Sequence, residues 1–310
     1  MPSKIEWTEE TWNPVTGCTK VSAGCQNCYA ERMSRRLAGR YGYPLAPDHF
    51  NVTLHPDRLD QPEHWRKPRK VFVCSMGDLF HEDVPDDFID QVFMRIIWNG
   101  PAYLNQTEED PEGTFWPGHI FQILTKRPER MQDVVERWHR MLGNAGGPLG
   151  NMQLWYQDEY GHRIPHLWLG VTAENQDAAD ERIPWLFKTP AAIRFVSVEP
   201  MLGPVLLDNG VSSWLTCYGP DPLRYGEECC ELFSVTGQHF HGIDWVICGG
   251  ETGPGARPMA WHWAESLHQQ CLRAGVPFFF KHAGDAFEGN PELLPSGARQ
   301  WPKAVTNDLP

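Results

Sequence analysis

Three cysteines near the start of the sequence, Cys18, Cys25 and Cys28, fall within eleven residues in the spacing C-x6-C-x2-C. Thiolates are soft ligands that suit zinc or iron–sulfur clusters, and this spacing lets one loop surround one metal centre. The loop contains no fourth cysteine or histidine, whereas a structural zinc site normally has four protein ligands. The pattern therefore predicts an iron–sulfur cluster with one open iron. Zinc completed by a distant ligand and unligated thiols are the alternatives.

The segment after Cys28 has the pattern of a helix with one apolar and one basic side. Because a helix N-terminus stabilises negative charge, it favours the thiolate form of cysteines beside it. The apolar side consists of Tyr29, Met33 and Leu37, and the basic side of Arg32, Arg36 and Arg40.

Polar residues recur where apolar, strand-like runs end. One such residue is ordinary, since it belongs to a loop or caps the next helix, as Asn175 is expected to do. Acidic residues at nearly every end favour a shared ligand site, because the loops after the strands of a βα barrel meet at one mouth. In chain order these residues are Ser75, Asp78, His81, Thr125, Lys126, Arg127, Thr172, Glu174, Asn175, Ser197, Glu199, Gly249, Gly250, Glu251, Lys281 and His282.

The runs are continuous apolar stretches, which is the pattern of parallel strands buried on both faces. They alternate with amphipathic helices over 85–98, 128–142 and 261–274. A further helix should follow Asn175, where Pro184 is expected to kink or end it. We therefore expect a parallel βα barrel or a partial, TIM-like (β/α)6–8 barrel with long loop insertions. Strands are expected at 70–75, 119–125, 166–172, 193–198, 243–248 and 276–281, with a weaker one around 7–13.

A single domain over residues 1–310 accounts for these elements, with the cluster loop at 12–31 and an irregular tail at 284–310. The insertion 206–242 contains cysteines and histidines that suggest a second metal site. Its adjacent Cys-Cys pair is not a normal zinc spacing, so incidental roles are expected instead. Those residues are Cys217, Cys229, Cys230, His239 and His241, and the other insertions span 41–69, 101–118 and 144–165.

Composition sets further limits. No stretch approaches the roughly 20 apolar residues of a membrane span, and the start of the sequence lacks the apolar run of a signal peptide. We expect a cytoplasmic protein without membrane contact, in which nine cysteines bind metal or pack rather than form disulfides. The net charge of −13 disfavours the binding of polyanions such as nucleic acid, unless one of the basic segments 32–40 and 66–70 provides a local site. The alternative expectation for both segments is an ordinary charged surface that faces solvent.

The cysteine loop and the partial βα barrel together resemble the radical S-adenosylmethionine (SAM) superfamily. In that superfamily three cysteines hold a [4Fe–4S] cluster and SAM chelates the fourth iron. The usual spacing is C-x3-C-x2-C, from which this loop departs. More closely, the chain resembles a phage-associated, radical-SAM-like family of unknown function over nearly its whole length. The matching stretches are WNPVTGC…GCQNCYAE, SMGDLFHEDVP, ILTKRPERM, LGVTAEN, VSVEPMLGP, GGETGPGARPM and VPFFFKH.

The resemblance implies a [4Fe–4S] cluster on the three loop cysteines and a SAM site at the barrel mouth. Asp78 is placed to accept a hydrogen bond from the SAM amino group. Ser197 and Glu199 are expected to hold the ribose hydroxyls, and Lys126 or Arg127 to pair with the SAM carboxylate. The remaining cofactor-binding residues are expected to be Ser75, Thr172 and Glu174.

The expected function is that of a radical SAM enzyme, which cleaves SAM and abstracts hydrogen from a substrate. The substrate class that we favour is a nucleobase or nucleotide. Glu251, Lys281 and His81 are the expected catalytic residues. An external electron donor of the flavodoxin or ferredoxin type is the implied partner. Two other functions fit the same sequence: a βα-barrel hydrolase or lyase with a structural zinc, and a non-enzymatic, metal-binding phage adaptor.

Overall fold

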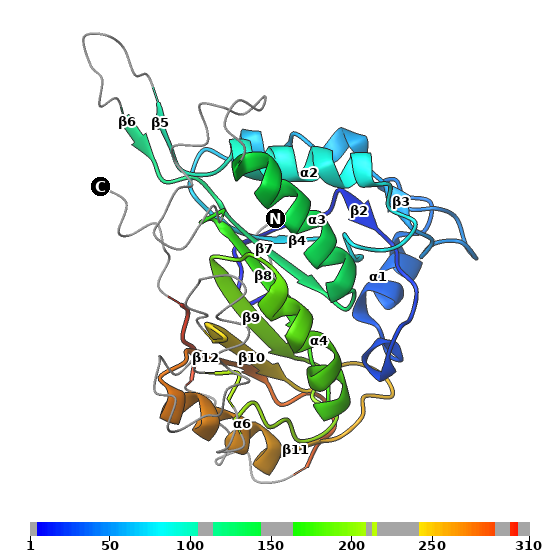
Figure 1. The fold of residues 1–310 in the computed structure, drawn as a ribbon. Coiled ribbons are helices and arrows are strands. Elements are labelled where there is room, and N and C mark those ends of the chain that lie inside the picture. The colour runs from blue at the N-terminus through cyan, green and yellow to red at the C-terminus, as the bar shows by residue number, and fades with distance from the viewer. Residues whose placement is uncertain are drawn as a thin grey trace.

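The computed structural model describes residues 5–104, 114–143, 164–208, 213–215, 242–288 and 298–302. Within them, seven parallel strands form one sheet in the order in which they occur along the chain. The sheet curls into an open half-barrel, as the partial-barrel prediction required (Figure 1). The strands are β1 Glu10–Trp12, β4 Lys70–Val73, β7 Ile120–Thr125, β8 Leu167–Thr172, β9 Ile193–Val198, β10 Trp245–Gly249 and β12 Phe278–His282.

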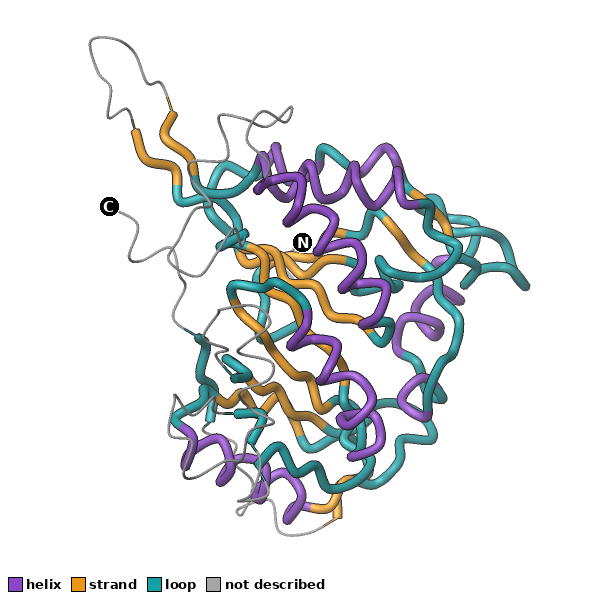
Figure 2. The backbone as a smooth tube through the Cα atoms, viewed as in Figure 1, coloured by secondary structure: helices purple, strands orange, loops and turns teal. Residues whose placement is uncertain are grey.

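Helices cover the outer, convex face of the sheet (Figure 2). Asn175 caps one of them by accepting a hydrogen bond from the Ala178 N–H at 3.0 Å, as predicted, and Gly275 ends another with a left-handed φ of 69°. Pro184 does not end its helix, which continues to Lys188. Because Pro184 is exposed, the carbonyl that its ring leaves without a donor can face water. These helices are α2 Asp86–Trp98, α3 Pro128–Gly143, α4 Gln176–Lys188 and α6 Trp261–Ala274.

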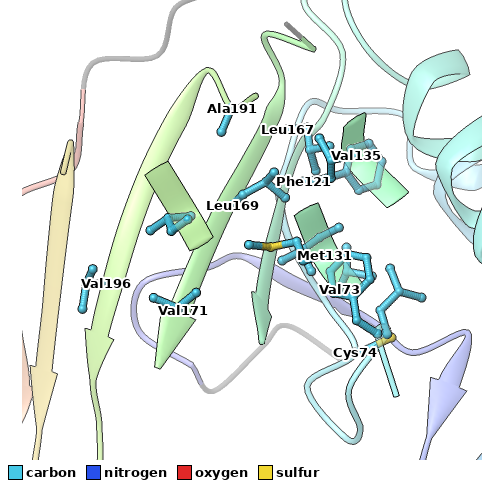
Figure 3. Packing of buried hydrophobic residues seen from close by; sticks show 14 of the residues in the cluster. Val73, Cys74, Phe121, Met131, Val135, Leu167, Leu169, Val171, Ala191 and Val196 are labelled. Atoms are coloured by element: carbon cyan, nitrogen blue, oxygen red, sulfur yellow. The ribbon is translucent and has the colours of Figure 1, made fainter. Parts of the chain in front are cut away.

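The main core lies between the sheet and these helices. Figure 3 shows Met131 and Val135 of α3 meeting Phe121, Leu167 and Leu169 from the two strands beneath them. All five side chains are at least 97% buried. Burial of such side chains stabilises the fold by about 1.5–3 kcal/mol each, so this layer holds the strands in register.

A second cluster fills the concave face near the amino-terminal ends of the strands. Trp168, Phe195 and Trp245 belong to it, and Trp7 joins them from the segment before β1. Side chains alternate between the two faces of a strand, so residues two or four positions further on point the same way. At the carboxyl-terminal ends these positions are polar. They include Thr172, Ser197 and Lys281, so the concave face changes from aromatic to polar toward one end.

Shorter elements sit outside the sheet. The cysteine loop contains a 3-10 helix at Ala23–Cys25 and leads into α1 Tyr29–Leu37, which stands apart from the outer helices (Figure 1). The insertion 101–118 forms an antiparallel pair that the sequence did not suggest, β5 Ala102–Leu104 with β6 Thr114–Trp116. Further short elements are β2 Val15–Thr16, β3 Thr53–Leu54, β11 Met259–Ala260, β13 Phe287–Glu288 and 3-10 helices at Pro56–Arg58 and Gln61–His64.

Part of the carboxyl-terminal tail extends the sheet. Residues 298–300 run antiparallel to β12, with the Phe280 N–H donating to Ala298 at 2.8 Å and the Gln300 N–H to Phe278 at 3.0 Å. Trp301 packs against Phe279, with ring centroids 4.9 Å apart. The tail therefore covers an edge strand that would otherwise expose unpaired backbone groups.

The cysteines and histidines of the insertion 206–242, Cys217, Cys229, Cys230, His239 and His241, lie outside the described residues. Among the helices that the structure does describe, none is long and apolar enough to cross a membrane.

Candidate functional site

The polar end of the half-barrel opens into a cavity of about 490 Å³. The cysteine loop forms one wall, and the carboxyl-terminal ends of the strands form the other. Of the strand-end residues predicted to share a ligand site, five do not line the cavity: His81, Glu174, Asn175, Gly249 and His282. The other predicted site residues all line it: Cys18, Cys25, Cys28, Ser75, Asp78, Thr125, Lys126, Arg127, Thr172, Ser197, Glu199, Gly250, Glu251 and Lys281.

The three loop cysteines are free and partly exposed. Burial, with the Asp78 carboxylate beside it, raises the pKa of the Cys18 thiol to about 11, against the opposing effect of Arg127. Burial also raises the pKa of Cys25, but the Lys126 ammonium and hydrogen bonds from the loop outweigh it, so the net pKa is lowered. The two cations after β7 therefore lie where they favour thiolate in the cavity.

The loop is held at its start by groups from the ends of β4 and β7. Gly17 has a φ of 83°, and a Cβ there would lie 2.1 Å from the Asn51 carbonyl oxygen, so this close crossing needs glycine. The buried His81 accepts the Asp83 N–H on Nδ1, which leaves Nε2–H to donate to the Thr19 hydroxyl at 2.8 Å. Arg127 donates to the same hydroxyl at 2.7 Å. His81 therefore positions the loop from behind.

The middle of the loop is held from the end of β8. Glu174 accepts the Gly24 N–H at 3.3 Å on one oxygen and Arg182 at 2.8 Å on the other. Both charged side chains are at least 97% buried. Arg182 also donates to the Thr172 carbonyl oxygen at 2.8 Å. Glu174 is thus a positioning residue that connects the loop to α4.

The end of the loop is held from β10. Glu251 accepts the Asn27 amide at 2.8 Å and forms an ion pair with Arg257. Arg257 donates in turn to the Ala23 carbonyl oxygen at 2.9 Å. Burial raises the pKa of Glu251, but the hydrogen bonds from Arg257 and Asn27 outweigh it and lower the pKa to about 2. The carboxylate is charged at neutral pH and engaged by the loop it supports.

Asp78 lines the cavity, yet protein donors engage both of its oxygens. One oxygen accepts the Phe80 N–H at 3.0 Å, and the other accepts the Lys126 N–H at 3.3 Å and Arg127 at 3.4 Å. The Thr125 hydroxyl lies within 2.9 Å of both. This carboxylate joins the ends of β4 and β7 and orients the cation that donates to Cys18 at 3.4 Å.

The opposite side of the cavity carries Glu199 and Lys281, joined at 2.5 Å. The Glu199 side chain is 22% exposed, and His282 lies 3.5 Å from the same oxygen. Burial raises the pKa of Glu199, but Lys281 and His282 outweigh it and lower the pKa to about 2. Ser197 lies two residues before Glu199, and its hydroxyl lines the cavity as well. Ser197 and Glu199 can therefore accept hydrogen bonds from a bound ligand, and the Ser197 hydroxyl can also donate one.

A fourth cysteine, Cys74, also reaches the cavity. It follows β4 with a left-handed φ of 59° and is 4% exposed. Burial raises the pKa of its thiol to about 12, and it belongs to the main core. Cys74 is therefore a packed thiol at the edge of the site.

The loop supplies donors of the kind that bind iron–sulfur clusters. Three partly exposed thiols from one loop face one cavity, beside Lys126 and Arg127, which offset thiolate charge. In the ranges that the structure describes, no three or more His, Cys, Asp or Glu side chains converge on a single metal position. This holds for the three loop thiols as well: in the described residues they line one cavity but do not converge on one metal position.

One family model matches residues 2–293 of this chain. The chain belongs to the DUF5131 family. The description of that family is "Protein of unknown function". No curated protein and no solved structure matches this DUF5131 chain.

Sequence reasoning missed several residues that shape the site of this DUF5131 chain. Asn27 lies inside the second cysteine spacing, and Arg257 in the stretch GGETGPGARPM. The sequence shows that an asparagine and an arginine are present, but it does not show which carboxylate each of them contacts. Arg182 carried a usable signal, because it falls between Ala179 and Ile183 on the buried face of α4. A charge on such a face needs a buried partner.

Proposed function

We propose that this chain is a radical SAM enzyme in which Cys18, Cys25 and Cys28 hold a [4Fe–4S] cluster and SAM binds in the adjoining cavity. The observation that carries the proposal is that three free thiols of one loop share a cavity with the polar ends of six consecutive parallel strands. When bound and reduced, the cluster supplies the electron that splits SAM into methionine and a 5′-deoxyadenosyl radical, which takes hydrogen from the substrate.

The cavity residues divide the binding of SAM between them. Lys126 donates to the Thr172 hydroxyl at 3.4 Å, and no carboxylate within the described part of the chain forms an ion pair with it. It is therefore a cation available for the SAM carboxylate. Ser197 and Glu199 offer a hydroxyl and a charged acceptor for the ribose diol. Trp7 lines the cavity and packs in the aromatic cluster of the concave face.

The carboxylates that face the loop position it and do not bind SAM directly. Asp78 holds Arg127 beside Cys18, and Glu174 and Glu251 hold the loop backbone. We propose a nucleobase or nucleotide as substrate, with Lys281 at the substrate side. The proposal includes an external electron donor of the flavodoxin or ferredoxin type.

Cluster loading after anaerobic reconstitution tests the metal site. We expect the parent protein to be brown, with iron and sulfide in equal amounts, and the variants Cys18→Ala, Cys25→Ala and Cys28→Ala to lose both. Cys271→Ala is the matched control, because Cys271 is fully buried in α6, away from the cavity. Unchanged iron and sulfide in the loop variants would falsify the cluster assignment.

The reaction is tested on the same reconstituted protein with dithionite and SAM. Chromatography should show slow release of 5′-deoxyadenosine by the parent protein and none by Cys28→Ala. The slow rate is expected because a cavity without its substrate is poorly closed, so buffer quenches the radical. A loaded cluster that binds SAM but never releases 5′-deoxyadenosine would favour the metal-binding adaptor.

A further inference from the structure

Helix α1 carries Arg32, which lines the cavity, and Arg36 one turn further on. Arg40, predicted on the same helix side, follows in the turn after α1, because the helix ends at Leu37 and Gly39 has a φ of 72°. Tyr29 and Arg32 line the cavity, and Arg36 and Arg40 are exposed to solvent. Arg32 and Arg36 are one helical turn apart, about 6 Å along the axis, and share a face of α1. We call Tyr29, Arg32, Arg36 and Arg40 the α1 track.

The arginines of the α1 track have no carboxylate partner among the residues that the structure describes. Glu31, the acidic residue within α1, pairs instead with Lys20 at 3.0 Å. Elsewhere most described arginines form ion pairs, including Arg69, Arg95, Arg127, Arg130, Arg137, Arg140, Arg182, Arg257 and Arg299. In a chain with a net charge of −13, the three arginines of the α1 track thus carry positive charge that no described carboxylate neutralises, and one of them lines the cavity.

The same track offers an aromatic surface. Tyr29 is 56% exposed although it lines the cavity, so one part of it is free at the mouth. Arg32 is held in place by a hydrogen bond to the Thr252 carbonyl oxygen at 2.7 Å. Cations that follow a phosphate backbone and an exposed ring on which a base can stack are the two features of single-strand binding sites.

We propose that the α1 track binds single-stranded nucleic acid and delivers one of its nucleotides into the cavity. Phosphates would lie on Arg36 and Arg40, and a base beside Tyr29 at the entrance. A single strand fits better than a duplex, because a reacting base must leave its stack to enter a cavity. The delivery of a reacting nucleotide rests on the proposed function, whereas the binding itself does not.

Fluorescence anisotropy with a labelled, mixed-sequence single strand of about 12 nucleotides, as DNA and as RNA, tests the proposal. Titrations are made on the reconstituted protein over a series of salt concentrations. Two lost phosphate contacts should make the negative slope of log K against log salt shallower by about 1.4 and weaken binding about 25-fold near 0.1 M salt. We expect this of the double variant Arg36→Gln/Arg40→Gln. Arg273→Gln, an exposed arginine in the last turn of α6, should leave both values unchanged.

Tyr29 provides a second, independent measurement. Tyr29→Ala should weaken binding with an unchanged salt slope, and Tyr29→Phe should restore the affinity, because stacking needs the ring and not the hydroxyl. Equal affinity of the parent and the double variant, or no binding by the parent, overturns the proposal. So does a double variant that binds the strands normally but accepts electrons more slowly from reduced flavodoxin, since the track would then be a docking site for an acidic protein.

Measuring strand binding and 5′-deoxyadenosine release on the same cluster-loaded protein separates the two proposals. Strand binding in a protein unable to release 5′-deoxyadenosine supports the track and rejects the proposed function. Release of 5′-deoxyadenosine by a protein that does not bind the strands supports the proposed function and rejects the α1 track as a binding site.

Discussion

The carboxylate of Asp78 shows what decides the role of a single residue in this site. It follows β4 at the cavity, where a free carboxylate would suit the SAM amino group. In the fold, its oxygens accept from the backbone of Phe80 and Lys126 and from the side chains of Thr125 and Arg127. Because its oxygens already accept hydrogen bonds from the protein, Asp78 acts on SAM binding indirectly, by orienting Arg127 and the end of β7.

Asp78→Asn should therefore destabilise the protein as well as weaken SAM binding. The amide NH2 group would face N–H donors, and a lost charge-assisted hydrogen bond costs about 1.5–3 kcal/mol. Urea denaturation gives the free energy of unfolding, and calorimetric titration gives the SAM affinity. An Asn variant with unchanged unfolding but weaker SAM binding would show that Asp78 contacts SAM directly.

At the scale of elements, the cysteine loop is an irregular segment that three strand ends hold in place. His81 after β4, Glu174 after β8 and Glu251 after β10 each bond to a different part of it. A loop without its own ladder of hydrogen bonds has little intrinsic order. Its thiols therefore depend on these contacts for a common direction.

The Glu251 contact makes the stability of this arrangement depend on pH. Its pKa is lowered to about 2, so its contribution is fully present above the unfolded pKa of about 4.3 and is lost as the pH falls through the folded value. Glu251→Gln should reduce the free energy of unfolding by about 2 kcal/mol at pH 7, and this difference should disappear toward pH 2. Urea denaturation across that range measures it.

Glu181→Gln is the control for this prediction. Glu181 is exposed on α4 and forms no ion pair within the described residues. It should change the free energy of unfolding little at any pH. A Glu251→Gln effect that stays constant from pH 7 to pH 2 would show that the contact does not depend on ionisation.

At the scale of the whole molecule, the segment before β1 and residues 298–302 of the tail pack against the half-barrel and against each other. Trp7 packs against Phe72 of β4 at 4.7 Å and Trp245 of β10 at 6.1 Å, so it reaches across the concave face. Trp301 of the tail packs on β12 and donates to the Trp7 carbonyl oxygen at 3.4 Å. The two segments thereby support each other on the open sheet.

Trp7→Ala should lower the free energy of unfolding by about 3–5 kcal/mol, the usual cost of removing a buried tryptophan. Trp98→Ala is the matched control, because Trp98 is 54% exposed and the Arg95 guanidinium lies over its ring at 5.4 Å. That change should cost about 1 kcal/mol or less. Urea denaturation of both variants measures the difference. Similar losses would mean that the segment before β1 is not part of the concave core.

Local pattern alone determined the strands, the outer helices and their ends at Asn175 and Gly275, since these depend on neighbours within one element. It also placed the cysteines and the polar strand ends at one mouth, because parallel strands share their carboxyl-terminal direction. Only the tertiary structure decided what those polar residues do. Glu251 meets Asn27 across 224 positions, and Glu174 meets Gly24 across 150. A side chain's type shows that it needs a partner, but only the packed chain brings that partner within hydrogen-bond distance.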